Sequence, residues 1–128
     1  MIPKYRVWDV VKKSMSEVQA IVYAEEKIYP IYSKVIRRYI PFNEAILMQS
    51  TGKMDSTGKV EVYAGDILYY PDQDECNYGI IEFDEDKLAF VLDNGYEKFI
   101  YGDYGMDKVV GNIYQNKDLA DYILGGNQ

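Results

Sequence analysis

The sequence contains no histidine and a single cysteine, Cys76, among its 128 residues. One thiol cannot close an intramolecular disulfide, which excludes the disulfide framework of a small secreted domain. Zinc sites built on Cys and His, Ser-His-Asp triads and Cys-His pairs all need residues that this chain lacks. Only carboxylate, Lys, Tyr or metal-oxygen chemistry is left open. We therefore predict that the protein is not an enzyme, with no catalytic residues, no cofactor and no metal.

Long apolar runs are also missing. No stretch approaches the roughly 20 apolar residues that span a bilayer, and the opening MIPKYRVWDVVKK lacks the apolar run of a signal peptide. The composition, 48% apolar and 27% charged, is typical of a folded globular chain rather than a disordered one. We expect a cytoplasmic protein that makes no membrane contact.

Charge is distributed unevenly along the chain. Residues 1–64 carry ten Lys/Arg and seven Asp/Glu, whereas residues 65–128 carry four and fourteen, so net charges of +3 and −10 sum to −7. The basic excess lies in 27–43, which has no acidic residue, and the acidic excess lies between Lys59 and Lys87. Such an asymmetry predicts fields of opposite sign on one molecule.

Short runs rich in Val, Ile and Tyr, separated by turn residues, predict strands rather than helices. We place these strands at 4–8, 18–24, 27–32, 35–40, 45–49, 66–70, 78–84, 88–92, 96–101 and 108–114. The predicted fold class is mainly β, with small antiparallel sheets and little helix. Residues 1–50 form a β-rich region and 51–128 a region resembling an SH3-like or irregular barrel, although one continuous domain or an irregular sandwich fits the same pattern.

Turn chemistry refines this prediction at three places. Asp93-Asn94-Gly95 favours a hairpin with a two-residue type I′ turn, because Asn-Gly tolerates positive φ. Pro30 has no amide donor, so its strand should lie at an edge or end there. Near the C-terminus, Asn116 is positioned to cap one helical turn before Gly125.

Two segments resemble ligand-binding motifs but lack residues that those motifs require. The loop TGKMDSTGKV has five residues between Gly52 and Gly58, and Val60 stands where a P-loop needs a hydroxyl, so we interpret it as a glycine-rich turn between strands. The run from Asp72 to Cys76 lacks the glycine and final glutamate of an EF-hand. A looser Ca²⁺ or Mg²⁺ site within 72–75 stays open as a minor alternative to a solvated loop.

One segment combines aromatic rings with positive charge, as single-strand nucleic-acid binders do. With a net charge of −7 we do not expect nucleic acid to be the partner. These cations instead face the acids of the same chain or of a second copy, which predicts a homo-oligomer. The predicted interaction residues are Tyr29, Tyr32, Lys34, Arg37, Arg38, Tyr39, Asp84, Glu85 and Asp86.

Three segments, YRVWD at 5–9, LMQSTGKMDSTGKVEVYAGDIL at 47–68 and GNIYQNKDL at 111–119, resemble the YopX-like family of small phage and prophage proteins. The family has no established active site. The resemblance implies a phage accessory β protein of unknown function in the host cytoplasm. The shared residues have structural explanations: Trp8 as a core anchor, Asp9 as a polar contact of the first strand, Asp66 after a turn, and Gly111 at a close backbone approach or a bulge.

The preferred functional hypothesis is a non-enzymatic binding or interaction module for a host or phage protein. Two alternatives stay open. One is an acidic decoy or inhibitor that presents the carboxylates of 66–86 to a host nucleic-acid-binding protein, with a steep salt dependence. The other, ranked last, is an enzyme that uses carboxylates and a hard metal ion.

Overall fold

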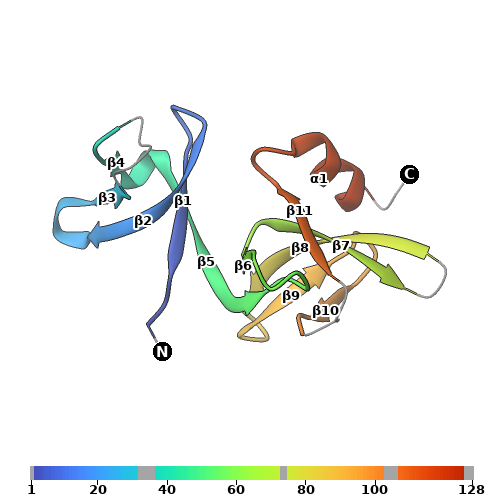
Figure 1. The fold of residues 1–128 in the computed structure, drawn as a ribbon. Helices are drawn as coiled ribbons and strands as arrows, with labels where there is room; N and C mark the ends of the chain where they lie inside the picture. Colours follow the sequence, from blue (N-terminus) through green and yellow to red (C-terminus); the bar gives the residue numbers. More distant parts are fainter. Residues whose placement is uncertain (1, 32–36, 73–74, 103–106, 126–128) are drawn as a thin grey trace. The chain divides into compact units, whose positions relative to one another are not determined.

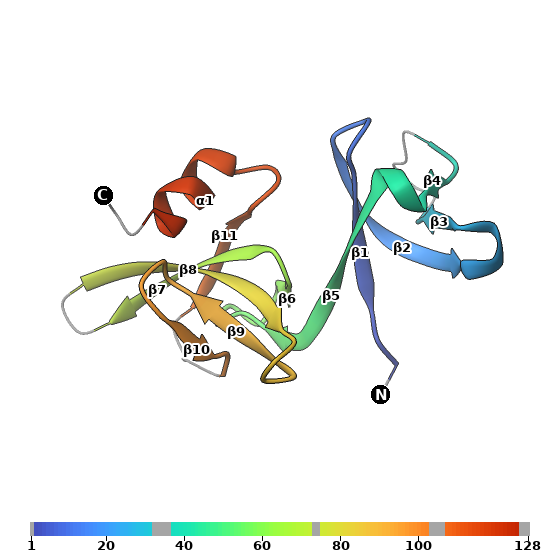
Figure 2. The same ribbon diagram turned by 180° about the vertical axis from the view of Figure 1, so that it is seen from behind.

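The computed structural model describes residues 2–31, 37–72, 75–102 and 107–125, without the side chains of 72, 75 and 76. The chain divides into two compact units, Met1–Ser50 and Thr51–Gln128, and each has its own hydrophobic core. Antiparallel strands dominate both units (Figures 1 and 2), which confirms the mainly β fold class. In the part of the chain that is described, no helix is long and apolar enough to cross a membrane.

The first unit is a single antiparallel sheet in the order β4-β3-β2-β1-β5, and β5 continues into the second unit. Two short 3₁₀ turns precede β3 and β5. The elements are β1 (Tyr5–Asp9), β2 (Ser14–Val22), η1 (Tyr23–Glu25), β3 (Lys27–Pro30), β4 (Ile40–Pro41), η3 (Phe42–Glu44) and β5 (Ala45–Met54).

Strand alternation decides which side chains fill the first core. Val7, Ile28 and Ile40 are buried there, whereas Trp8 is half-buried, because neighbouring strand residues point to opposite faces. The prediction that Trp8 anchors the core is therefore wrong, and Val7 takes that place. β3 ends at Pro30 as expected, since proline has no N–H for the ladder.

A two-pronged polar contact of the first unit joins Asp9 to Arg37. The guanidinium donates from Nε and Nη2 to the two carboxylate oxygens at 2.8 Å each, and its Nη1 lies 2.7 Å from Glu44 Oε1. Asp9 is 1% exposed. Burial alone would raise its pKa, but the Arg37 fork and two backbone N–H donors outweigh burial and lower it. The predicted polar role of Asp9 is confirmed.

The second unit contains a five-stranded antiparallel sheet in the order β10-β9-β8-β7-β11. A short strand, β6, pairs with the distal part of β5, where Thr51 Oγ1 donates to Val62 O at 2.8 Å. The elements are β6 (Glu61–Tyr63), β7 (Asp66–Asp72), β8 (Glu75–Asp84), β9 (Ala89–Asp93), β10 (Lys98–Ile100), β11 (Lys108–Asn112) and α1 (Lys117–Leu124).

Both faces of this sheet are covered. Helix α1 packs Ala120 and Ile123 against Ile67 and Ile80 on one face, as its place over β7 and β8 in Figure 1 shows. A second core combines residues of the sheet with Val62 of β6: it consists of Val62, Leu68, Ile81, Leu92 and Tyr101. Because both faces are covered, the apolar side chains of the sheet are buried without the sheet closing into a barrel.

All ten expected strands overlap an observed strand, but 35–40 does so only at Ile40, where β4 begins. Residues 37–39 are not a strand, and 35–36 lie outside the described residues. β6 was not predicted, because its three residues adjoin the glycine-rich turn. The register shift between Val109 and Gly111 confirms the bulge expected at Gly111.

Three details differ from expectation. Within the described residues, the five-stranded sheet is an open series and not a barrel. The β9–β10 hairpin exists, but its loop runs from 94 to 97 and only Gly95 has positive φ, so the turn is not type I′. Helix α1 is longer than one turn, and the Asn116 side chain accepts from Asn112 N at 3.1 Å instead of capping the helix.

Replacing Arg37 should destabilise the first unit. We expect Arg37→Met to lower the free energy of unfolding by about 3 kcal/mol, because it leaves the buried Asp9 carboxylate without its charged partner. Trp8, the only tryptophan, lies in this unit. Its fluorescence during urea denaturation therefore reports the effect directly.

The neighbouring Arg38 is exposed and supplies a matched control. Arg38→Met should change stability by no more than about 0.5 kcal/mol. Because the folded pKa of Asp9 is lowered from 3.8, its contribution is present above that value and is lost as pH falls through the folded pKa. An equal loss of stability in Arg37→Met and Arg38→Met would contradict a stabilising role for the Asp9–Arg37 contact.

Candidate functional site

The predicted aromatic residues gather on the first unit. Tyr29 of β3 and Tyr39 lie with ring centroids 6.1 Å apart, and Lys27 Nζ is 4.3 Å from the centre of the Tyr39 ring. Tyr39 also lines a hollow of about 420 Å³ beside Phe42. Tyr32 and Lys34 lie outside the described residues.

The two predicted arginines have different roles. Arg37 is held by Asp9 and Glu44, and these contacts keep its pKa above the usual value. Its guanidinium therefore makes its ion pairs within the first unit. Arg38 is exposed and keeps an outward-facing charge.

The predicted acids lie in the second unit, at the turn between β8 and β9. Asp84 Oδ1 accepts from Asp86 N at 2.9 Å and from Lys87 N at 3.2 Å, so this carboxylate organises the turn. Glu85 and Asp86 are exposed. The predicted basic and acidic residues thus belong to different units.

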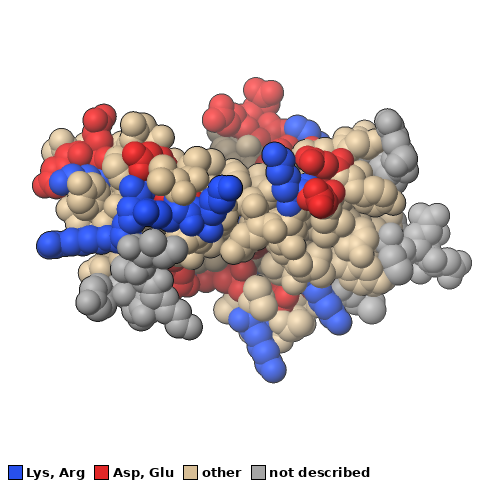
Figure 3. Space-filling model, turned by 90° about the horizontal axis from the view of Figure 1, so that it is seen from above, with Lys and Arg blue, Asp and Glu red and all other residues tan. Residues whose placement is uncertain are grey.

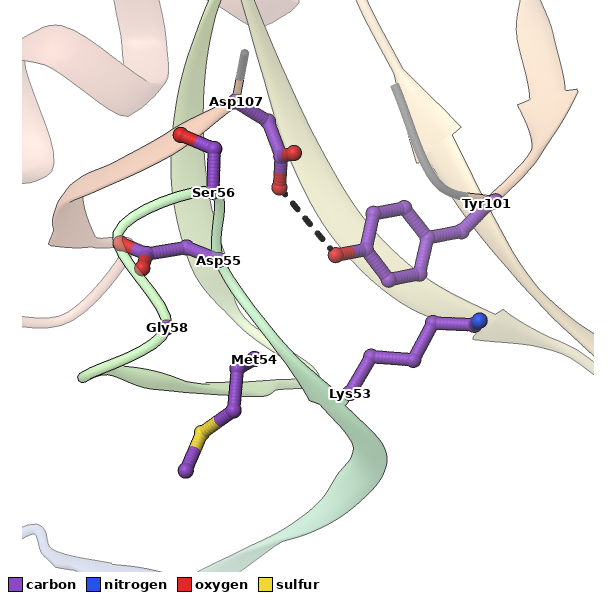
Figure 4. Close-up of a pocket in the computed structure, with 8 residues that line it drawn as sticks. Lys53, Met54, Asp55, Ser56, Gly58, Tyr101 and Asp107 are labelled. Carbon is purple, nitrogen blue, oxygen red and sulfur yellow. Dashed lines mark hydrogen bonds between the residues drawn. The ribbon is translucent and has the colours of Figure 1, made fainter. Parts of the chain in front are cut away.

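A pocket of about 450 Å³ opens on the second unit beside the glycine-rich turn (Figure 4). The end of β5 and the turn after it provide one side, and the segments flanking β10 and β11 provide the other. Its lining residues are Lys53, Met54, Asp55, Ser56, Gly58, Tyr101, Gly102 and Asp107. Gly58 has φ +71, the left-handed conformation that the turn requires.

The Asp55 side chain stabilises the turn that lines this pocket. Its Oδ1 accepts hydrogen bonds from Thr57 N at 3.0 Å and from the Thr57 hydroxyl, and its Oδ2 accepts from Val109 N at 3.2 Å. The side chain therefore fixes its own turn and ties that turn to β11. Burial would raise the pKa of Asp55, but the donors from Thr57 and Val109 outweigh burial and lower it.

Asp107 and Tyr101 form the opposite wall. Asp107 is 3% exposed and Tyr101 is 8% exposed, and the Tyr101 hydroxyl lies 3.3 Å from Asp107 Oδ2 in donating geometry. The carbonyl of Asp107 accepts from Ser56 N at 2.8 Å, which joins this wall to the β5–β6 turn. Backbone and side-chain hydrogen bonds thus hold both walls in place.

The rim of the pocket carries different chemistry from its walls. Lys53 is exposed, and Met54 is 54% exposed. Lys53 makes no ion pair with any described residue. A cation and a flexible thioether beside a polar hollow can contact an anionic group and an apolar side chain together.

Among the residues that the structure describes, no group of three Asp, Glu or Cys side chains is arranged to hold a metal ion. The proposed loose cation site at 72–75 falls outside this search, because its side chains are not described. The glycine-rich turn has the positive φ values expected at Gly52 and Gly58. No phosphate-binding sequence accompanies them.

Sequence reasoning did not identify Tyr101 or Asp107 as pocket residues. Asp55 is separated from them by more than forty positions, and only the folded chain brings the three segments together. One local signal was available: Asp followed two residues later by Thr, beside glycine, is typical of a turn in which the carboxylate accepts backbone hydrogen bonds.

Comparison with known proteins is decisive for the family. The family model described as "YopX protein" matches residues 4–121. The chain belongs to the YopX family. All residues of the pocket lie within the matched range. No curated protein matches the chain.

Two solved structures resemble this YopX-family chain. Protein EF1440 from Enterococcus faecalis is 27% identical, with a TM-score of 0.70, and the match covers 93% of this chain and 98% of that protein. Protein YopX from Bacillus subtilis is 22% identical, with a TM-score of 0.60 and coverage of 91% and 96%. The second likeness supports the fold alone.

Asp55→Asn should weaken the link between the turn and β11. The Asn amide can still accept from Thr57, but its NH₂ group would face the Val109 N–H, so the second unit should lose about 1–3 kcal/mol. Faster hydrogen exchange at the Val109 amide, measured by NMR, would locate the effect.

Ser56→Ala is the control, because the Ser56 contact is made by its backbone N–H. It should leave Val109 exchange unchanged. The lowered pKa of Asp55 also means that its stabilisation is present above the ordinary value of 3.8 and disappears as pH falls through the folded pKa. An Asn variant with unchanged Val109 protection would contradict the proposed contact.

Proposed function

We propose that this YopX-family protein is a non-enzymatic binding module whose ligand site is the pocket of the second unit. The observation that carries the proposal is the state of Asp55. Both of its oxygens accept structural hydrogen bonds, and its pKa is lowered. A general acid or base works best with a pKa near the operating pH, so this carboxylate is suited to shaping a wall rather than exchanging protons.

The rim indicates the kind of ligand. Lys53 supplies a positive charge without an ion-pair partner among the described residues, and Met54 supplies exposed apolar surface. Together they favour a protein segment that places a carboxylate beside an apolar side chain. A volume of about 450 Å³ accommodates a few side chains rather than a whole domain.

The biological setting is part of the same proposal. The resemblance to phage and prophage proteins supports an accessory role in the cytoplasm of a host bacterium. The partner is then a host or phage protein.

The test is affinity capture from host lysate, read by mass spectrometry, with the full chain as bait. Lys53→Ala combined with Met54→Ala should reduce capture of the partner at least tenfold without lowering the melting temperature. Raising the salt concentration should weaken capture by the unaltered chain, because one contact is ionic.

Lys117→Ala with Leu124→Ala is the matched control, since it also removes one lysine and one exposed apolar side chain, here from α1. It should capture normally. Capture that survives the pocket variant would refute the site. Capture that instead requires Glu85 and Asp86 would favour the acidic decoy.

A further inference from the structure

Two hairpin loops in this chain share one backbone design. Loop 10–13 joins β1 to β2, and loop 85–88 joins β8 to β9. In the first, Asp9 Oδ1 accepts from the backbone N–H groups two and three residues later, both at 3.0 Å. Asp84 Oδ1 does the same in the second, at 2.9 and 3.2 Å. The last loop residues, Lys13 and Leu88, have φ 53 and 51.

The net charges of these matched loops are opposite in sign. Loop 10–13 exposes two lysines and no acid, and its two valines, Val10 and Val11, are 47% and 55% exposed. Figure 3 shows Lys and Arg side chains gathered on the first unit in the view from above. Loop 85–88 exposes two acids and one lysine, and Leu88 is 77% exposed.

Each loop therefore combines apolar surface with charge, which is the chemistry of an interface centre and its rim. The exposed Val10-Val11 pair leaves apolar surface in contact with water, and burying that surface against a partner would be favourable. Loop 85–88 offers the apolar side chain of Leu88 together with two acids and one lysine, so its net charge of −1 is opposite in sign to the +2 of loop 10–13. The complement of the basic loop is thus present in the chain itself.

We propose that loop 10–13 of one copy docks on loop 85–88 of a second copy. Val10 and Val11 contact Leu88, while Lys12 and Lys13 pair with Glu85 and Asp86. This assignment moves the basic side of the expected self-association away from Arg37, which Asp9 and Glu44 already hold. It does not use the pocket and stands independently of the proposed function.

The geometry of such a contact sets its consequences. Different surfaces meet, so the contact is heterologous and leaves a free loop of each kind, which leads to rings or open chains. Two four-residue loops bury less than the roughly 1,200 Å² of a standard interface, so the association is weak. Loops held by their own aspartates lose little entropy on docking, which favours the contact.

The first test measures self-association of the full chain by sedimentation equilibrium, from low to high micromolar concentration. The unaltered chain should associate, and the association should weaken when salt is raised, because screening shortens the reach of the charges. Lys12→Glu with Lys13→Glu, and separately Glu85→Lys with Asp86→Lys, should each weaken association at least tenfold. Val10→Ser with Val11→Ser should weaken it without changing the charge.

The second test uses charge complementation. Mixing the two charge-reversed variants should restore association, because loop 10–13 of each variant is then opposite in charge to loop 85–88 of the other, and the two variants should alternate in the assembly. Combining all four reversals in one chain should restore self-association.

Lys108→Glu with Lys117→Glu is the control, since it makes the same net-charge change as Lys12→Glu with Lys13→Glu, at exposed positions outside both loops. It should associate as the unaltered chain does, and circular dichroism should show every variant folded. The proposal is overturned by a strict monomer at high micromolar concentration. It is also overturned by association that the loop variants leave intact, by a control that weakens it equally, or by a mixture that forms no complex.

Discussion

Aspartate side chains that accept backbone N–H groups are the interaction on which the rest of this structure depends. A chain made of short strands must reverse direction often, and each reversal leaves amide groups without a ladder partner. Asp9, Asp55 and Asp84 each satisfy such groups in their own turns. Asp66 does the same in the turn between β6 and β7, accepting from Tyr63 N at 2.8 Å while almost completely buried. Part of the acidic composition therefore stabilises the fold.

The sequence predicted the strands well because their signal is local. Runs of Val, Ile and Tyr with alternating burial identify strands whatever they pair with. Pairing and closure are not local, so the open sheet could not be distinguished from a barrel. The turn at Asp93 shows the limit at short range: Asn-Gly favours type I′, but the Asp93 and Asn94 side chains accept three backbone N–H groups and stabilise a longer loop.

The candidate site was less predictable than the fold, for the same reason. Arg37 looks like a surface cation in sequence, and only the structure shows it joined to an acid 28 positions away. The pocket combines Asp55 with Tyr101 and Asp107, whose roles depend on hydrogen bonds made across the second unit. A motif search finds none of these, because no local spacing encodes them.

The number of charged residues in the sequence is also larger than the number of charges exposed to a partner. Asp9, Arg37 and Glu44 neutralise one another within the first unit, and the Asp55 carboxylate is 5% exposed and saturated with donors. The outward-facing charges include loop side chains that no turn uses, such as Lys12 and Glu85. Inward-facing aspartates set the shape of each loop, so its outward side chains can differ in charge without changing that shape. Loops 10–13 and 85–88 show this: the same backbone conformation carries a net charge of +2 in the first loop and −1 in the second. In the proposed self-association, recognition is therefore decided by the side chains that remain exposed after the turns are satisfied.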